Sequence, residues 1–245
     1  MRKLIEEIDK LIAKAREQRR REEFQGALET IEKALKITEE LPEDQRREKK
    51  GEVYDMKGRI LYHMGKQYED RAKIEKAFEI NEKAIELRAS DLTIVGYAYS
   101  MWQRFIYSRA LGKKVDVEKI RISQKRAYQV ALVSGDLQRV GDFSHNLAFL
   151  LQIEAEEQID PDRKRVKFEE AIIEYRKALL FRQLAGDKRG QAMTLDQQAE
   201  CCLKLALLNL TEATKIYEER GDKEGLRRVE ERKRYFLSSL SEYKS

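Results

Sequence analysis

The sequence predicts an all-helical protein built from repeated helix pairs, and three observations point to this class. Apolar residues recur at steps of three and four, as at Phe24, Ala27, Ile31 and Ala34, which is the spacing of one buried helix face. The chain has only 2 prolines and 12 glycines, too few for turns between many strands. Echoes of the tetrapeptide Glu32–Leu35 recur at Glu82–Ile85, Lys125–Tyr128, Arg176–Leu179 and, more weakly, Thr211–Thr214.

The first two helices are predicted from complementary apolar faces. The first should run from Lys3 to Arg21, and its apolar residues form two rows, Leu4-Ile8-Leu11-Ala15 and Ile5-Ile12. The second carries the stripe that starts at Phe24, in which small alanines let a neighbouring helix approach closely. Pro42 should end it, because proline disfavours helical geometry in the preceding residue and suits the first turn of the next helix.

The middle of the chain predicts four more helices. A third helix is expected from Asp44 to Tyr68 and a fourth from Arg71 to Ala89, and the boundary between them, near residues 64–70, is the least clearly marked in the chain. Ser90 and Asp91 are predicted to cap a helix that reaches Leu111 and ends at Gly112. Asp116 should cap the next helix, which extends to about Ser134.

Glycine followed by aspartate is a recurrent boundary signal. Gly135–Asp136, Gly186–Asp187 and Gly221–Asp222 should each end one helix and start another, and Asp160–Pro161 combines an N-cap with a first-turn proline. An acid stands nine residues after Ala34, Ala127, Ala178 and Ala213, at Glu43, Asp136, Asp187 and Asp222. This constant spacing predicts a single repeat domain, 1–245, with repeats at about 2–41, 44–89, 91–134, 136–185 and 187–220 and a polar cap at 222–243.

Composition narrows the function classes. The net charge of +5 permits an acidic partner but falls short of the dense basic patch that nucleic-acid binding needs. Cys201 and Cys202 are neighbours and cannot form an ordinary disulfide with each other, which indicates a reducing compartment. Acidic residues interrupt the apolar N-terminal run, and no later segment is apolar enough to span a membrane. We therefore expect a cytoplasmic protein without membrane contact.

The repeats resemble the tetratricopeptide family, whose first helices carry the pattern W-x2-L-G-x2-Y and whose second helices carry small residues at fixed places. The Phe24 stripe fits the second-helix spacing, Asn146-Leu147-Ala148 is similar to a first helix, and Gly186–Gly190 is similar to the link of longer variants. Aligning the first helices on Gly58, Gln103, Ala148 and Ala199 gives intervals of 45, 45 and 51 residues, longer than the family's 34. The resemblance implies a right-handed α-solenoid of about five helix pairs with a terminal cap.

The resemblance also implies a binding groove on the first helices. The groove should be lined by three columns of side chains, counted from the aligned small position of each first helix. The residues three before it are Ile12, Asp55, Ser100, His145 and Asp196, and those one after it are Arg16, Arg59, Arg104, Phe149 and Glu200. The residues four after it are Arg19, Tyr62, Tyr107, Gln152 and Leu203. Recurring arginines suit carboxylates, and tyrosines supply contact area at low entropy cost. We expect a non-enzymatic scaffold that binds an acidic or extended peptide. The alternative is that Arg59 and Arg104 pair with Glu52, Asp55 or Asp142.

The aromatic residues near position 100 divide between core and groove. Trp102 and Phe105 are expected in the core, whereas Tyr97 and Tyr107 are expected to be exposed to a partner. These two tyrosines complete the candidate partner-binding set together with Asp142, which lies beside His145 on a helix face.

Catalytic motifs are weak. The chain has 2 histidines in different repeats, and it contains no phosphate loop and no H-E-x-x-H pattern. Asp142 could orient His145 as a base, but such a pair is more often a surface hydrogen bond, so no enzyme activity is expected. Asp142, His145 and Asp196 could form a metal site across two repeats, but carboxylates and a single histidine are too common in proteins to be evidence for one. No metal or cofactor is therefore predicted.

Two other partner classes are left open. Single-stranded RNA could bind the groove or the basic terminal helix through Arg227, Arg228, Arg232, Lys233 and Arg234, although Glu230 and Glu231 interrupt that run. A homodimer could form through the first helix, where the two apolar rows are wider than a single contact requires.

Overall fold

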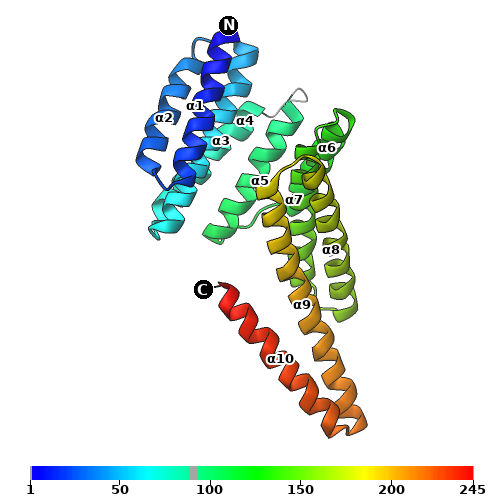
Figure 1. The fold of residues 1–245 in the computed structure, drawn as a ribbon. Helices are drawn as coiled ribbons and strands as arrows, with labels where there is room; N and C mark the ends of the chain where they lie inside the picture. Colours follow the sequence, from blue (N-terminus) through cyan, green and yellow to red (C-terminus); the bar gives the residue numbers. More distant parts are fainter. Residues whose placement is uncertain (1, 89–92, 245) are drawn as a thin grey trace. The chain divides into compact units, whose positions relative to one another are not determined.

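The fold is all-helical. The structure, a computed structural model, describes residues 2–88 and 93–244, with side chains up to residue 238. These ranges contain ten helices and no strand (Figure 1). The helices are α1 (Arg2–Arg20), α2 (Phe24–Thr38), α3 (Glu43–Gln67), α4 (Arg71–Arg88), α5 (Ile94–Leu111), α6 (Val117–Val133), α7 (Leu137–Glu157), α8 (Pro161–Leu184), α9 (Lys188–Arg220) and α10 (Lys223–Lys244). None of the described helices has the length and apolar character needed to cross a bilayer.

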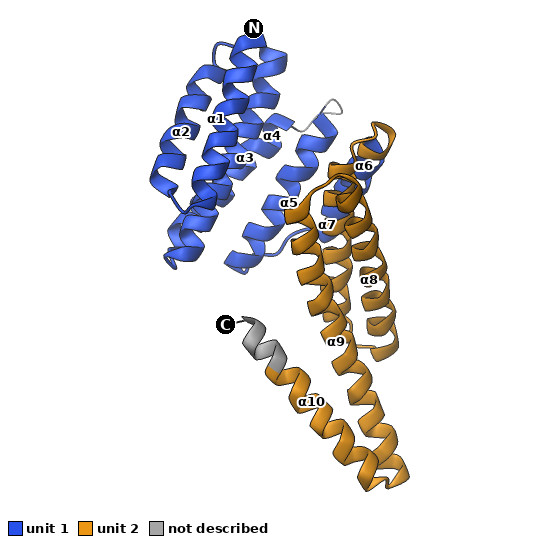
Figure 2. Ribbon diagram, viewed as in Figure 1, with its two compact units in different colours: residues 1–130 blue, residues 131–245 orange. Residues whose placement is uncertain are grey.

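The chain divides into two compact units, coloured separately in Figure 2. Unit 1 covers residues 1–130, with α1 to α5 and most of α6. Unit 2 covers residues 131–245, with the end of α6 and α7 to α10. In unit 1 each helix from α1 to α4 packs against the next one, and in unit 2 α7, α8, α9 and α10 pack in the same successive way, so each unit has a core of its own.

The first core of unit 1 contains the predicted stripe of α2. Phe24, Ala27, Ile31 and Ala34 are all buried, together with Ile8, Ile12 and Ala15 of α1 and Val53, Met56 and Ile60 of α3. The partly buried Leu4, Ile5 and Leu11 also pack against this core. None of the described large apolar side chains of α1 is exposed. The two rows on this helix are therefore used inside unit 1, where they join α1 to α2 and α3.

A second cluster in unit 1 lies where α3, α4 and α5 meet. Leu61, Ala77, Ile80 and Tyr107 are buried there, with Tyr62 and Phe78 partly buried against them. The side-chain amide of Gln124 on α6 donates to the carbonyl of Ala98 on α5 at 2.7 Å. This buried hydrogen bond links the sixth helix to the fifth.

The core of unit 2 gathers small and aromatic side chains of three helices. Ala148 and Ala155 of α7, Phe168, Ala171, Ile172 and Tyr175 of α8, and Cys201 of α9 form one buried cluster. The alanines of α7 allow the close approach that the larger side chains of α8 fill. Burial raises the pKa of the Cys201 thiol to about 12, so this cysteine behaves as a small core residue.

Most predicted helix boundaries are confirmed. Asp116, Asp136, Asp187 and Asp222 each accept a hydrogen bond from the backbone amide three residues on, at 2.9 to 3.1 Å. Gly112, Gly135, Gly186 and Gly221 adopt left-handed backbone angles, with φ between 67° and 70°, which end the preceding helices. The cap predicted at Ser90 and Asp91 lies outside the described residues.

The C-terminal part differs from the prediction. The segment 187–220 was expected to form a helix pair, but α9 runs without a break from Lys188 to Arg220. No glycine or proline stands between Gly190 and Gly221 to stop it. The helix predicted as a terminal cap is α10, which packs along α9 as its partner (Figure 1).

The burial of Ala34 generates a stability prediction. Ala34→Arg should lower the free energy of unfolding by more than about 3 kcal/mol, because a guanidinium would enter a fully buried helix contact. Urea unfolding monitored by circular dichroism measures this change. Lys33→Arg, on the exposed side of the same turn, is the control and should leave stability within about 0.5 kcal/mol. Equal stability of both variants would contradict the core assignment.

Candidate functional site

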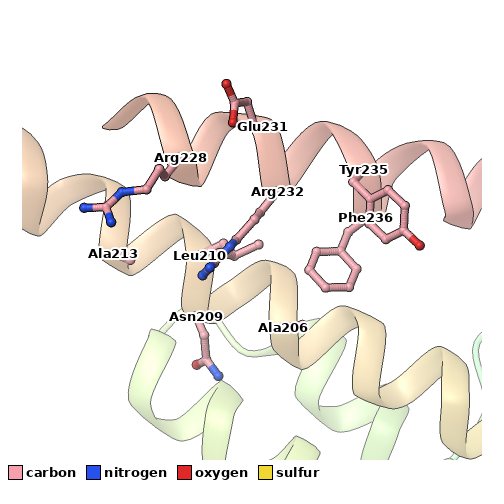
Figure 3. A pocket seen from close by; sticks show the side chains of 9 residues that line it. All are labelled: Ala206, Asn209, Leu210, Ala213, Arg228, Glu231, Arg232, Tyr235 and Phe236. Atoms are coloured by element: carbon pink, nitrogen blue, oxygen red, sulfur yellow. The ribbon is translucent and has the colours of Figure 1, made fainter. Parts of the chain in front are cut away.

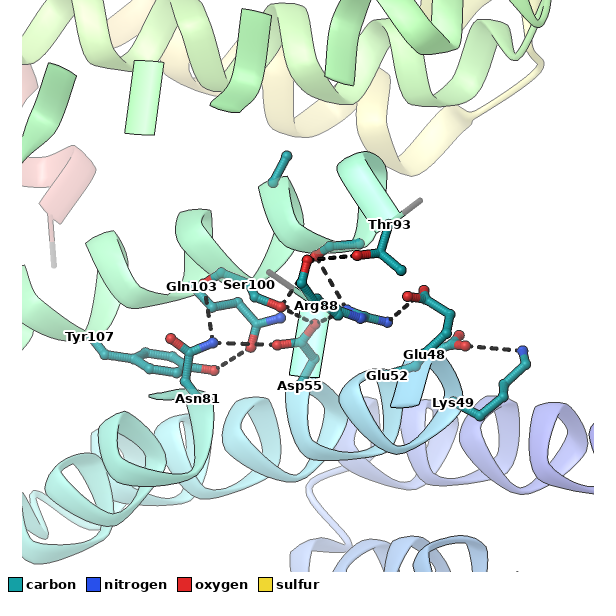
Figure 4. Close-up of polar contacts among 12 residues, drawn as sticks. Glu48, Lys49, Glu52, Asp55, Asn81, Arg88, Thr93, Ser100, Gln103 and Tyr107 are labelled. Atoms are coloured by element: carbon teal, nitrogen blue, oxygen red, sulfur yellow. Dashed lines mark hydrogen bonds and ion pairs between the residues drawn. The ribbon is translucent and has the colours of Figure 1, made fainter. Parts of the chain in front are cut away.

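A buried arginine cluster occupies the place where three helices of unit 1 meet. Arg88, the last residue of α4, is 3% exposed, and its guanidinium contacts Asp55 of α3 directly (Figure 4). It also donates to the carbonyl of Gly96 at 3.3 Å, to the hydroxyl of Ser100 at 3.4 Å and to Glu48 at 3.3 Å. One side chain thereby joins α3, α4 and α5.

The carboxylate of Asp55 is the other centre of this cluster. Ser100 donates to Asp55 at 2.9 Å, and the amide of Asn81 donates to it at 3.3 Å (Figure 4). Burial raises the pKa of Asp55, while the positive charges of Arg88 and Arg59 and these two hydrogen bonds act in the opposite direction. The carboxylate of Asp55 thus has a guanidinium and two further donors, which is the environment of a structural ion pair, whereas the buried Nε atom of Arg88 has no hydrogen-bond partner among the described residues.

Unit 2 contains the same arrangement. Arg182 of α8 is 3% exposed and donates to the carbonyl of Gly190 at 2.6 Å, to the hydroxyl of Thr194 at 2.6 Å and to Asp142 at 2.9 Å. In both clusters the glycine, hydroxyl and acidic partners stand 8, 12 and 40 residues from the arginine. The two clusters share these three partners, although the buried Asp55 of the first has no acidic counterpart in the second, where His145 lies against Thr194. We call them the arginine brackets.

Glycines make room for each bracket. A Cβ atom at Gly51 or at Gly96 would lie 2.8 Å from the Nε atom of Arg88. At Gly141 it would lie 2.7 Å from Cγ of Arg182, and at Gly190 it would lie 2.8 Å from Cδ. Each arginine is therefore held between glycines of two successive first helices, an approach that any side chain would block.

Four predicted groove residues belong to these brackets instead. Asp55, Ser100 and His145 are at most 6% exposed, and Asp142 is the carboxylate partner of Arg182. The prediction that Asp55, Ser100 and His145 line a groove is wrong, because the position three before the small residue faces the neighbouring helix. The arginine at the end of the second helix then covers it from the other side. Asp142 is half-buried and is paired with Arg182.

The structure also corrects the alignment of the fourth first helix. Thr194 occupies the place of Ser100, so Gln197 rather than Ala199 corresponds to Gln103, and Ala199 is exposed. His145 meets this threonine, with 3.4 Å between its Nδ1 atom and the hydroxyl oxygen. Asp196 is exposed and does not share this position.

Two aromatic predictions are also corrected. Tyr107 was expected in the groove but is 2% exposed, because Gly58 leaves room for its ring against α3. Trp102 was expected in the core but is half-buried, with its ring centroid 5.2 Å from that of the buried Phe105. Tyr97 is half-buried as well.

Two arginines of unit 1 are a different kind of site. Arg16 of α1 is exposed and Arg59 of α3 is half-buried, and neither forms a salt bridge among the described residues. Partial burial lowers the pKa of Arg16, as do the positive charges of Arg59 and Arg20. Two guanidinium groups thus lie near each other without a carboxylate bound between them.

The neighbours of Arg59 hold it in place. When the amide of Gln103 is oriented with its oxygen toward the guanidinium, it accepts from Nε and Nη2 of Arg59 at 3.0 and 3.1 Å. In this orientation its nitrogen donates to the hydroxyl of Tyr107 at 2.8 Å and to the carbonyl of Asp55 at 3.0 Å. Arg59 forms no salt bridge in this network, although its positive charge acts on the nearby buried carboxylate of Asp55.

The remaining predicted residues flank this pair. Arg19 and Tyr62 are half-buried, and the ring of Tyr62 lies 5.0 Å from that of Tyr107. Arg104 instead pairs with Glu82 of α4 at 2.9 Å and stacks over Phe78, so its charge is neutralised. Of the predicted arginine column, only Arg16 and Arg59 present positive charge without a paired carboxylate.

Sequence reasoning left out two neighbours of this site. Tyr99 lies close enough to Arg16 to affect its pKa, and Gln103 positions Arg59. The substitution of glutamine for the small residue at position 103 was visible in the sequence. The contacts of this glutamine could not be predicted, because the sequence does not distinguish a glutamine that bridges two helices from one that is exposed to water.

A separate groove lies between α9 and α10 in unit 2. It encloses about 900 Å³ and is lined by Ala206, Asn209, Leu210, Ala213, Arg228, Glu231, Arg232, Tyr235 and Phe236 (Figure 3). Arg228 and Arg232 are exposed and form no ion pair among the described residues. The described part of the chain contains no group of three or more His, Cys, Asp or Glu side chains that could hold a metal ion.

The Arg88 bracket predicts a large asymmetry between two Arg→Met changes. Arg88→Met should cost about 3 to 5 kcal/mol of stability, because Asp55 is then buried without its positive partner. Arg104→Met removes a half-exposed pair and should cost at most about 1 kcal/mol. Urea unfolding compares the two, and similar losses would show that Arg88 is not the central contact. Adding Asp55→Asn to Arg88→Met should recover part of the loss.

His145 predicts a pH dependence. Burial and the charge of Arg182 lower the pKa of His145 to about 3, so the ring stays neutral in the folded protein while an unfolded chain takes up a proton near pH 6.5. The unfolded state then binds more protons, and stability falls as the pH falls below about 6.5. Relative to His145→Asn, the wild type should lose about 2 kcal/mol between pH 7 and pH 5 in urea titrations. Parallel pH profiles would refute this assignment.

Comparison with known proteins identifies the fold but not a family. No family model matches the sequence, and no curated protein matches it either. Among solved structures, the chain is similar to BtubC (BKLC) from P. vanneervenii, with a TM-score of 0.50 and 17% identity over 97% of this chain and 92% of that chain. The de novo designed helical repeat protein DHR64 aligns over 99% of this chain and 98% of its own at 19% identity, with a TM-score of only 0.20. The likeness to BtubC concerns the fold alone, which is all-helical over the described residues.

Proposed function

We propose that the chain is a tetratricopeptide-like, right-handed solenoid of about five helix pairs that acts as a non-enzymatic, cytoplasmic scaffold for protein or peptide partners. Two features support the family assignment. Small residues recur on the second helices at Ala34, Ala84 and Ala178, all fully buried, and glycine–aspartate links join successive helices. The intervals of 45 residues between Gly51, Gly96 and Gly141 fit a lengthened form of this repeat.

The proposed binding site is the pair Arg16 and Arg59 on α1 and α3 of unit 1. The observation that carries the proposal is that neither charge forms a salt bridge among the described residues, although most buried or half-buried arginines, the class to which Arg59 belongs, form one. The carboxylate nearest in effect to Arg16 is that of Glu52, which forms its salt bridge with Lys49 instead. Two like charges held together raise each other's electrostatic energy, and an added carboxylate offsets this cost. Guanidinium groups bind carboxylates through paired, charge-assisted hydrogen bonds.

The surroundings favour a peptide over a small anion. Three tyrosines of α3 and α5 are half-buried, so part of each ring is accessible to a partner: Tyr62, Tyr97 and Tyr99. Tyrosines of this kind contribute contact area and a hydroxyl at low entropic cost. An extended acidic segment would place its carboxylates on the arginines and its backbone along the rings.

Binding of a fluorescein-labelled, glutamate-rich extended peptide, followed by fluorescence anisotropy, tests the site. Arg16→Gln combined with Arg59→Gln should weaken binding at least about tenfold, since each lost charge-assisted hydrogen bond contributes about 1.5 kcal/mol or more. Lys33→Gln with Lys83→Gln removes the same net charge from exposed positions on α2 and α4 and serves as the matched control. Equal loss in both double variants would refute a site at Arg16 and Arg59.

Single-stranded RNA is the second candidate ligand. The observation in its favour is the pair Arg228 and Arg232, exposed beside Tyr235 in the α9–α10 groove (Figure 3). Phosphate binding must weaken steeply as salt increases, because bound counterions are released. An unstructured RNA that binds at 50 mM salt, is lost at 300 mM and depends on Arg228 and Arg232 rather than Arg16 and Arg59 would favour this alternative.

A further inference from the structure

The outward face of α8 carries an apolar row that no other part of unit 2 covers. Val166, Ile173 and Leu180 follow one another at seven-residue steps, and their exposed fractions are 51%, 52% and 53%. Residues at this spacing lie along one side of a helix. Leu184, at the end of the same helix, is 62% exposed. The row runs along most of α8.

The chain itself shows what such a face normally carries. Counting from the buried alanines Ala34, Ala84 and Ala178, the places of Ile173 and Leu180 are taken by Glu29 and Lys36 in α2 and by Glu79 and Glu86 in α4. All four of these side chains are exposed and charged. At these places α2 and α4 therefore face water with charges, whereas α8 presents branched apolar side chains; α6 combines the two patterns, with the exposed Ile122 at the place of Ile173 and Gln129 at the place of Leu180. A row of this kind indicates a contact surface.

Charged residues flank the row in an ordered way. Glu169 and Glu170 stand before Ile173, and Arg176 and Lys177 stand after it. Glu169 and Arg176 are exposed, and neither side chain has an ion-pair or hydrogen-bond partner among the described residues. The acidic pair and the basic pair lie at equal distances along the helix on either side of Ile173.

We propose that this face binds the same face of a second copy of the chain, with the two α8 helices antiparallel and related by a two-fold axis near Ile173. Antiparallel pairing about this residue places Val166 of one copy near Leu180 of the other. It also places Glu169 and Glu170 beside the Arg176 and Lys177 of the second copy. A parallel pair would bring like charges together, so the charge pattern favours the antiparallel arrangement. A surface that complements itself in this way forms a closed dimer.

The expected dimer is weak. One helix face contributes less area than the roughly 1,200 to 2,000 Å² of a stable interface, so association should appear at roughly tens to hundreds of micromolar protein. The surface lies on unit 2, away in sequence from the residues proposed to bind peptide. Failure of either proposal would thus leave the other untouched.

Sedimentation equilibrium of the full chain up to about 500 µM tests the dimer. The wild type should show a monomer–dimer equilibrium, and Ile173→Glu combined with Leu180→Glu should be monomeric at every concentration with an unchanged thermal midpoint. The matched control is Glu29→Arg with Lys36→Glu, which alters the equivalent outward face of α2 and should leave the equilibrium unchanged. A wild type that stays monomeric would overturn the proposal, as would a dimer that the α8 variant retains.

Charge reversal then tests the two-fold geometry. Glu169→Arg alone and Arg176→Glu alone should each weaken the dimer about fivefold or more, because each brings like charges of the two copies together. The combined variant exchanges the two charges and should restore the dissociation constant to within about twofold of the wild type. This rescue requires that residue 169 of one copy lies near residue 176 of the other. Additive weakening in the double variant would overturn the antiparallel arrangement.

Discussion

The packing of this chain depends on one contact that occurs in both units, a buried arginine held between two glycines. The guanidinium of Arg88 or Arg182 reaches from the end of a second helix to the carbonyl and hydroxyl of the following first helix, and to an acid on the preceding one. Apolar packing alone is not directional and would tolerate sliding of one helix along another. A planar group with five donors fixes both the distance and the register of three helices.

This contact explains why predictions from the family pattern were wrong at certain positions. The pattern places the residues three before the small position in the groove, and in this chain those positions hold Asp55, Ser100 and His145. Once an arginine enters from the second helix, the same residues become its partners and are buried. Helix positions in a repeat therefore keep their geometry while their neighbours change. A pattern of spacing therefore predicts the geometry of a helix position, but it does not predict which side chains surround that position.

The sequence predicted local features well and long-range polar contacts poorly. Aspartate caps, left-handed glycines and the stripe at Phe24 follow from rules that act within a few residues, and the structure confirms them. The end of α3 had no such signal, because Glu69 takes the positive φ that glycine usually supplies. Arg88 was not singled out, since its partners Glu48 and Asp55 stand 40 and 33 residues away. Arg16 and Arg59 stay predicted partner-binding residues, because neither forms a salt bridge among the described residues.

The arginine brackets also define the true period of the chain. Four residues after the repeat alanine, α4 and α8 have Arg88 and Arg182. The corresponding places in α2 and α6 hold Thr38 and Ala131. Both of these smaller residues are buried as well. The alanine recurs with every helix pair and the arginine with every second pair. A deletion that moved the sequence of α2 or α6 into the place of α4 or α8 would put a threonine or an alanine where Arg88 or Arg182 now joins three helices.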